Sequence, residues 1–339
     1  MRARLVVSLL GALAACGGEP SGPITTITEG ANPTSSAGPG GAGGATTTTS
    51  GGQGGSCPEG ACPATVLVSG IAQPLQVIVD GGHVYYTTGG TVERVPVTGG
   101  APTVLATDQA LPVSLALDQG RVYWTAAYDQ AVRSAPREGG PVSEVASGVT
   151  QPLGVAVDET RVYWTSGATG SVMAAPIAGG ATVVLASGQA APTGLAVDAT
   201  HVYWTNYDAL EGALMRADKA GGAAETLAGG QDRPRRILVE GDRVWWVEEG
   251  AGNVWSMPTS GGAPSKIASG EILPFGLAVD ATHVYWTSRS SGTVSRAPRE
   301  GGAAETLISG ISGATGVAVD EARVYVAAYY DGQILSLAR

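Results

Sequence analysis

The chain has 339 residues and a net charge of −10 at neutral pH, with 52 glycines, 20 prolines and one phenylalanine. Many turn-forming residues argue against long amphipathic helices and favour short strands joined by turns. The excess of acidic over basic residues and the lack of a basic tract argue against nucleic acid and anionic lipid surfaces as partners. We therefore expect an all-β protein that binds no nucleic acid.

The N-terminal segment predicts export. Residues 1–4 include two arginines, and residues 5–15 form an apolar stretch that is too short to cross a bilayer as a helix, which needs about 20 residues. We interpret residues 1–15 as a signal peptide. Its removal takes away Arg2 and Arg4 and brings the net charge to −12.

The end of this segment, Leu13-Ala14-Ala15-Cys16, resembles the lipobox of bacterial lipoproteins. The resemblance implies cleavage before Cys16 and lipidation of this cysteine as the new N-terminus. Gly17 follows it instead of aspartate, which in a Gram-negative lipoprotein implies the outer membrane. An ordinary secretory signal with a free cysteine is the alternative. The expected location is thus the cell envelope, with the lipid as the only membrane attachment.

Residues 16–56 consist almost wholly of glycine, serine, threonine, proline and alanine after the cysteine. They offer too few apolar side chains to offset the entropy of ordering, so we predict a disordered linker before a domain at residues 57–339. Cys57 and Cys62 stand at the start of that domain. In an oxidising compartment they favour a local disulfide loop, with two free thiols as the alternative. With only three cysteines in the chain, no metal site is predicted.

One segment with the pattern His/Arg-Val-Tyr-Trp-Thr recurs in seven variants, which start at His83, Arg121, Arg161, His201, Arg243, His283 and Arg323. Each belongs to a unit of about forty residues with four strand-like runs, which in the fourth unit are residues 194–198, 202–205, 213–217 and 224–227. We name these runs strands A to D. A Gly-Gly pair, typical of a hairpin turn, separates C from D in six units. The repeat predicts a seven-bladed β-propeller of four-stranded antiparallel blades.

The two ends of the array complement each other. The last unit stops after strand C, at Arg339, without a Gly-Gly turn or a strand D. Residues 64–69 resemble the strand D run of residues 304–309 and precede the first strand A. We expect residues 64–69 to be the outer strand that completes the last blade and closes the ring. Closure covers edges that would otherwise pair with other chains, so a monomer is expected.

Tyr-Trp-Thr after a Gly-Leu-Ala-Val-Asp strand resembles the YWTD repeats of low-density-lipoprotein-receptor propellers. The layout is also similar to the YVTN, NHL and streptogramin-lyase propeller groups, and the resemblance covers residues 64–339. The fourth YWTD position is not aspartate but Ala126, Ser166, Asn206 or Ser288. A blade-linking role of that aspartate is therefore not implied. YWTD rings have six blades, so the seven units here fit the YVTN and streptogramin-lyase groups better.

Residues that recur in every unit are interpreted as structural. An acid at the end of strand A is expected to cap the A–B turn, at Asp80, Asp118, Asp158, Asp198, Glu240, Asp280 and Asp320. The three histidines share one turn position that arginine fills in the other units, so we expect exposed turn residues and no general base. The repeated tryptophans and tyrosines are expected to pack between blades.

The units differ mainly on the face formed by the D–A and B–C loops. The fifth unit has Arg233-Pro234-Arg235-Arg236 where its neighbours have Pro-Thr-Gly or Pro-Leu-Gly, and Arg236 is predicted to reach the channel mouth. The candidate ligand-binding residues are Arg235, Arg236, Glu248, Glu249, Tyr128, Asp129, Tyr207, Asp208, Arg289, Tyr329, Tyr330 and Asp331. Such a set is typical of a polar or carbohydrate-like binding surface. An internally neutralised, solvated set of loops is the alternative.

Two functions remain open. The favoured one is a non-catalytic scaffold or binding module without a cofactor, whose partner is an envelope protein, a glycan or a small polar ligand. The other is a streptogramin-lyase-like or hydrolytic enzyme that uses Glu248 and Glu249 with a divalent metal. The resemblance implies that such a lyase has a histidine on the ligand face beside glutamate and magnesium, whereas the histidines here map to the opposite face. The chain also has no G-x-S-x-G, H-E-x-x-H or P-loop pattern, so no catalytic residue is assigned.

Overall fold

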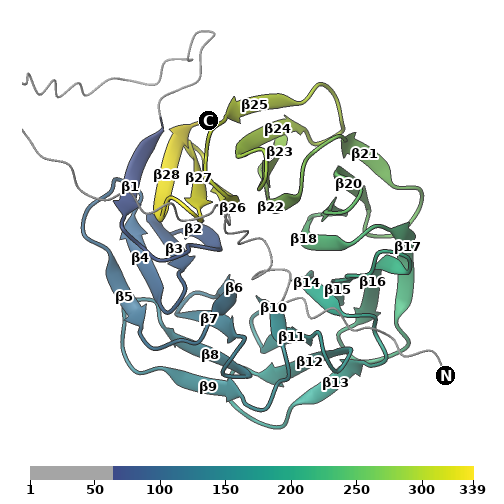
Figure 1. Ribbon diagram of the computed structural model, residues 1–339. Helices are drawn as coiled ribbons and strands as arrows, with labels where there is room; N and C mark the ends of the chain where they lie inside the picture. The colour runs from purple at the N-terminus through teal and green to yellow at the C-terminus, as the bar shows by residue number, and fades with distance from the viewer. Residues whose placement is uncertain (1–63) are drawn as a thin grey trace, which may run out of the picture. The chain divides into compact units, whose positions relative to one another are not determined.

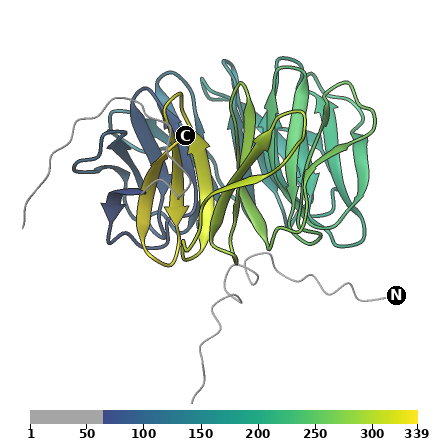
Figure 2. The same cartoon turned by 90° about the horizontal axis from the view of Figure 1, so that it is seen from above.

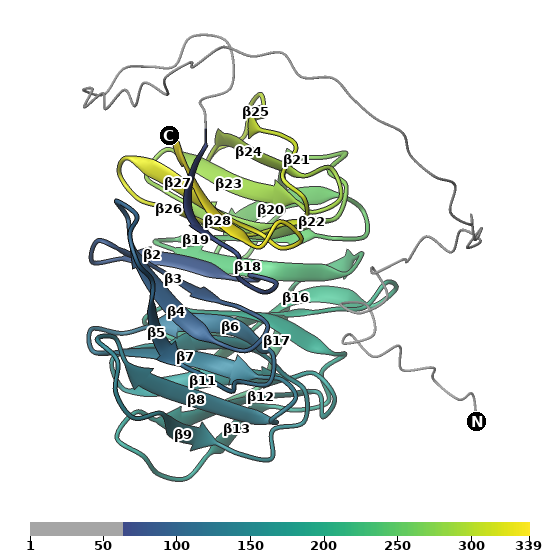
Figure 3. The same ribbon diagram turned by 60° about the vertical axis from the view of Figure 1, so that its left-hand side comes forward.

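A computed structural model describes residues 64–339, which form seven four-stranded sheets arranged in a ring (Figure 1). Figures 2 and 3 show the sheets standing side by side around this ring. The predicted signal peptide, the predicted lipidation site Cys16, the predicted linker and the Cys57–Cys62 pair lie outside the described residues. Residues 64–339 contain no helix, and so none that is long and apolar enough to cross a membrane.

Every blade has the predicted order of strands A to D from the channel outwards. Strands A are β2 (Val77–Asp80), β6 (Pro112–Leu117), β10 (Pro152–Val157), β14 (Pro192–Val197), β18 (Pro234–Glu240), β22 (Pro274–Val279) and β26 (Ala314–Val319). Strands B are β3 (His83–Thr87), β7 (Arg121–Ala126), β11 (Arg161–Ser166), β15 (His201–Asn206), β19 (Arg243–Glu248), β23 (His283–Ser288) and β27 (Arg323–Ala328). Strands C are β4 (Val92–Pro96), β8 (Ala131–Pro136), β12 (Ser171–Pro176), β16 (Gly212–Asp218), β20 (Asn253–Pro258), β24 (Thr293–Pro298) and β28 (Gln333–Ala338). Strands D are β5 (Thr103–Ala106), β9 (Ser143–Ala146), β13 (Val183–Ala186), β17 (Glu225–Gln231), β21 (Ser265–Ala268), β25 (Glu305–Ile308) and, for the last blade, β1 (Thr65–Ser69). Blades are numbered 1 to 7 in the chain order of their strands A.

Strand β1 closes the ring. It pairs antiparallel with β28, so the last blade has the order β1-β28-β27-β26 (Figure 1). Leu67 and Val68 of this strand are buried in one cluster with Val84 of blade 1 and Ile334 of blade 7. The predicted closure by an N-terminal outer strand is confirmed.

The Tyr-Trp-Thr segments fill the space between blades. The indole rings of Trp124, Trp164, Trp204, Trp246 and Trp286 are fully buried. Trp204 of blade 4, for example, lies in one cluster with Tyr163 and Leu185 of blade 3. The predicted packing role of these residues is confirmed, and large aromatic side chains supply much of the apolar area between blades.

In blades 2, 3, 4 and 6 the threonine of this segment links neighbouring blades near the channel. In blade 3, Thr165 Oγ1 accepts a hydrogen bond from the Gly154 N–H (2.8 Å) and donates one to the Thr193 carbonyl of blade 4 (2.9 Å). The same pair of bonds is made by Thr125, Thr205 and Thr287. We call this arrangement the threonine bridge.

Two blades have no threonine at this position. In blade 7, which has Ala327 there, the link to blade 1 comes from Thr315 Oγ1 of strand A, which donates to the Pro74 carbonyl (3.1 Å). Blade 5 has Val247, a fully buried side chain without a hydroxyl. Across the described chain, no side-chain hydrogen bond joins β18 of blade 5 to β22 of blade 6. The seam between blades 5 and 6 therefore has no threonine bridge.

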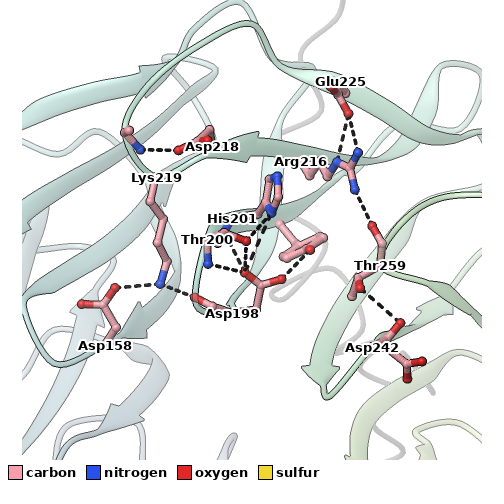
Figure 4. A network of polar contacts seen from close by, with 12 residues as sticks. Asp158, Asp198, Thr200, His201, Arg216, Asp218, Lys219, Glu225, Asp242 and Thr259 are labelled. Carbon is pink, nitrogen blue, oxygen red and sulfur yellow. Dashed lines mark hydrogen bonds and ion pairs between the residues drawn. The ribbon is translucent and has the colours of Figure 1, made fainter.

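The acids at the end of strand A cap most A–B turns. In blade 4, one Asp198 oxygen accepts the N–H groups of Thr200 and His201, and the other accepts the Tyr203 hydroxyl (Figure 4). Equivalent bonds to two turn N–H groups and a tyrosine are made by Asp118, Asp158 and Asp280, and by Asp320. Burial acts to raise the pKa of Asp280, but these hydrogen bonds outweigh it and lower the pKa to about 2. The predicted cap is confirmed at these five positions.

Ion pairs join neighbouring blades on the face that carries the A–B turns. Lys219, which follows strand C of blade 4, pairs with Asp158 of blade 3 (2.7 Å; Figure 4). Its Nζ atom also lies 5.4 Å from the centre of the Tyr163 ring. The same position in other blades provides the pairs Arg137–Asp80, Arg299–Glu240 and Arg339–Asp280. The prediction that Asp80 and Glu240 cap their turns is not supported by any such hydrogen bond, and both acids instead pair with a cation of the next blade.

Deleting residues 57–70 removes β1 and leaves the outer edge of β28 unpaired. We expect the truncated protein to aggregate, because an exposed edge strand pairs with other chains. Light scattering coupled to gel filtration measures this. A truncated protein that stays monomeric and as stable as the complete chain would count against strand-exchange closure.

Replacing Thr165 with valine keeps the shape of the side chain but removes the threonine bridge between blades 3 and 4. We expect a loss of about 2 kcal/mol in the free energy of unfolding, because two backbone groups lose their partner. Urea unfolding measures the loss, with Thr103→Val on the exposed outer strand β5 as the control. Equal stability of the two variants would show that the bridge is unimportant.

Candidate functional site

The D–A and B–C loops surround one mouth of the central channel. The channel has a volume of about 460 Å³ and is lined by the seven strands A. Its wall is mainly valine, isoleucine, leucine and alanine, with Gln76, Ser114, Arg236 and Glu240 as the polar and charged residues. A space of this size lies within the range of about 300–1,000 Å³ that is usual for small-ligand sites.

Arg236 occupies a ring of equivalent positions at the start of the seven strands A. The other members of this ring are Gln76, Ser114, Gly154, Gly194, Gly276 and Gly316. A Cβ atom on Gly154 would lie 2.3 Å from the Thr193 carbonyl oxygen, and one on Gly276 would lie 2.2 Å from that of Thr315. The next blade therefore allows only glycine at these positions, and blades 1, 2 and 5 are the ones that carry a side chain.

The side chains at these three positions differ in what they contact. Gln76 exchanges hydrogen bonds with the backbone of Leu115 in blade 2, and Ser114 accepts one from the Val155 N–H of blade 3. Arg236 forms no hydrogen bond and no ion pair within the described part of the chain. Burial, together with the nearby charge of Arg235, lowers the pKa of Arg236 to about 10. The guanidinium therefore remains charged at neutral pH.

Arg235 and Glu249 form an ion pair at the rim of the mouth. The distance from Arg235 Nη1 to Glu249 Oε2 is 2.6 Å, and the side chains are 16% and 13% exposed. Tyr207 donates its hydroxyl to Glu249 (3.0 Å), and the Arg235 guanidinium lies 4.4 Å from the Phe275 ring centre and 5.8 Å from that of Tyr207. Burial and the charge of Glu249 raise the pKa of Tyr207 to about 12. These contacts hold the pair in a fixed position.

Arg289 extends this cluster into blades 6 and 7. Its guanidinium lies 4.9 Å from the ring centre of Tyr329 and 5.7 Å from those of Phe275 and Tyr330. Within residues 64–339 no acidic side chain pairs with Arg289, and its Nε atom is buried without a hydrogen-bond partner. We call Tyr207, Arg235, Phe275, Arg289, Tyr329 and Tyr330 the aromatic–arginine row.

Phe275 is the member of this row that the sequence analysis missed. It stands directly before Gly276 in strand A, where an apolar residue is expected in the core. It is the only phenylalanine in the chain, and the sequence contains no other signal that distinguishes it from a core residue. Its ring is largely buried and lies beneath the two guanidinium groups.

Glu248 does not reach the row. Its side chain is buried, and its carboxylate accepts hydrogen bonds from the Asp232 N–H (2.7 Å), Asn253 Nδ2 (2.7 Å) and Trp255 Nε1 (2.8 Å). All three donors belong to blade 5. Glu248 and Glu249 are neighbours in sequence but do not share one site.

The remaining candidates lie in the loops around the mouth. Asp129 pairs with Arg133 (2.6 Å), while Asp208 and Asp331 accept backbone N–H groups of loop residues. Tyr128 in blade 2 is 61% exposed. The three aspartates thus stabilise loops, and Tyr128 presents its ring to solvent.

The opposite face holds the histidines. His83, His201 and His283 begin strand B and are partly buried, and the Nδ1 atom of each ring contacts its own A–B turn. The expectation of exposed histidines is thus only partly met. Among residues 64–339, no three or more histidine, cysteine or acidic side chains come close enough together to hold a metal ion.

No family model and no curated protein matches the sequence. Solved structures share its fold. Virginiamycin B lyase from Staphylococcus aureus has a TM-score of 0.71 at 16% identity, over 82% of this chain and 98% of that chain. A streptogramin B lyase gives 0.71 at 14% identity, over 81% and 96% of the two chains. A chain of the nidogen/laminin complex gives 0.60 at 18% identity, over 70% and 97%.

These similarities confirm, at the level of the fold, the predicted resemblance to streptogramin-lyase and YWTD propellers. The chain folds as a seven-bladed propeller of this kind. At sequence identities this low, the similarity supports a shared fold but not a shared activity.

Replacing Glu248 with glutamine puts an amide N–H₂ group either against the Asp232 N–H or against the side-chain donors of Asn253 and Trp255. We expect this to lower the free energy of unfolding by about 2 kcal/mol, because at least one buried donor loses its acceptor. Urea unfolding measures the change. The control is Glu300→Gln, which removes an exposed ion pair with Arg243 and should cost less than about 1 kcal/mol. If both variants unfold alike, Glu248 does not have the structural role described.

Proposed function

We propose that this protein is a non-catalytic binding module that contacts its partner through the D–A/B–C loop face. The aromatic–arginine row carries this proposal, because it runs across blades 4 to 7 beside the channel mouth. Tyrosine and arginine are enriched at binding hot spots, where they combine large contact area with hydrogen bonds or charge. Two tyrosines of this face, Tyr128 and Tyr330, are 61% and 53% exposed.

The location is part of the same proposal. The four lipobox positions ending at Cys16, after a basic and then apolar segment, support lipid anchoring in the cell envelope. The composition of residues 17–56 supports a tether between the lipid and the propeller. The partner is then an envelope protein, a glycan or a small polar ligand that meets the propeller in that compartment.

An enzymatic function on this face has less support. The carboxylate of Glu248 is buried among three donors, and Glu249 is held by Arg235 and Tyr207. The histidines belong to the A–B turns of the opposite face. The likeness to lyases favours the enzyme only through the shared fold.

A variant with Tyr128→Ser and Tyr330→Ser tests the proposed face. We expect partner recovery from the native envelope to fall by roughly tenfold, the effect of losing hot-spot side chains. Quantitative pull-down with the full-length protein measures recovery. The matched control is Val104→Ser with Val184→Ser, which removes two exposed apolar side chains from the outer strands. Undiminished recovery by the tyrosine variant contradicts the proposal.

A further inference from the structure

We infer that the channel mouth holds a subsite for the anionic group, a carboxylate or phosphate, of a small organic ligand, with Arg236 as its principal contact and Arg289 at the rim. This inference rests on the proposed function and names the ligand chemistry of the same face.

Arg236 has no ion-pair partner among residues 64–339. The nearest acid on its own strand, Glu240, lies four residues further along β18, which is roughly 13 Å at the rise of a β-strand. Glu240 is also paired with Arg299 of blade 6 (2.8 Å). The rest of the ring around Arg236 consists of Gln76, Ser114 and four glycines. Arg236 is only partly exposed in the channel, where an unpaired charge has limited access to water, and a bound anion would compensate it.

The surroundings of Arg236 add to this positive charge. Two arginines of this face, Arg233 and Arg235, pair with the acids Asp232 (3.1 Å) and Glu249 (2.6 Å). Arg236 and Arg289 remain without an acidic partner among the described residues. Within residues 64–339, no direct ion pair therefore neutralises the charge of Arg236 or of Arg289.

The geometry favours a small ligand with an apolar or flat body. The guanidinium groups of Arg235 and Arg289 both lie over the Phe275 ring, so the charge is gathered beside an aromatic surface. The channel below is lined mostly by aliphatic side chains. Guanidinium binds carboxylate and phosphate oxygens through paired hydrogen bonds, which Arg236 can offer because its own donors are free of protein partners.

The unfolding temperature of an Arg236 variant distinguishes a structural role from a binding role. Gln76 and Ser114 use the equivalent positions to join adjacent blades, and their loss would weaken the ring. Arg236 joins nothing, so its replacement by glutamine should raise the unfolding temperature of the ligand-free protein. A charged residue that lowers the stability of the ligand-free protein is expected at a site where ligand binding needs that charge.

The experiment uses the purified full-length protein with benzoate and phenyl phosphate as probes and benzamide as the neutral analogue. We expect calorimetry to detect binding of at least one anion and no binding of benzamide. Arg236→Gln should weaken anion binding by roughly tenfold or more, as expected for the loss of a charged hydrogen-bond donor. Arg243→Gln, an arginine of the same blade on the opposite face, is the control and should bind like the wild type. The anion should raise the unfolding temperature of the wild type more than that of Arg236→Gln.

Three results overturn the inference: no binding of either anion by the wild type, equal affinity of the wild type and Arg236→Gln, or equal binding of benzamide and benzoate. A lower unfolding temperature of ligand-free Arg236→Gln would assign Arg236 a structural role instead. Loss of partner capture by the tyrosine variant, combined with no anion binding, refutes the subsite alone. Normal capture by the tyrosine variant, combined with anion binding that depends on Arg236, refutes the proposed interaction face alone.

Discussion

The close approach of adjacent strands A is the constraint on which the ring depends. At Gly154, Gly194, Gly276 and Gly316 a Cβ atom would lie against the backbone of the next blade. The threonine bridge uses this proximity, because one hydroxyl can satisfy an N–H of its own blade and a carbonyl of the next. Both groups lie near the channel, where unmet backbone polar groups are costly. The ion pairs further out add less, since most have a partner exposed to solvent.

Blade 5 departs from this scheme twice at the same seam. Arg236 stands where glycine is usual, and Val247 stands where the bridging threonine is usual. Each change alone removes a structural feature that neighbouring blades share. Together they leave the seam between blades 5 and 6 without a threonine bridge and place a charged side chain in the channel. Departures from a structural rule without a structural gain are expected at functional positions.

The sequence predicted the fold well because the repeat is strict and its ends are complementary. Strand bounds moved by a residue or two at most positions, as β14 does in beginning at Pro192, but the identity of each strand, including the outer strand that closes the ring, followed from the pattern. The candidate site was harder to predict. Glu248 and Glu249 look equivalent in sequence, and only contacts with Asn253 and Trp255 of the next strand decide that Glu248 is internal. Phe275 has the sequence context of a core residue, and only the structure places the guanidinium groups of Arg235 and Arg289 over its ring.

The pairing of Thr65 with Ser336 has a consequence for how the protein folds. The first strand of the propeller to be made is among the last to find its place, because its partner β28 is the last of the 28 described strands. Contacts between such distant segments form slowly, since a long loop must close first. A chain interrupted before its last strand can build six blades and still lack a closed ring. Closure of the ring therefore has to wait until β28 has been made.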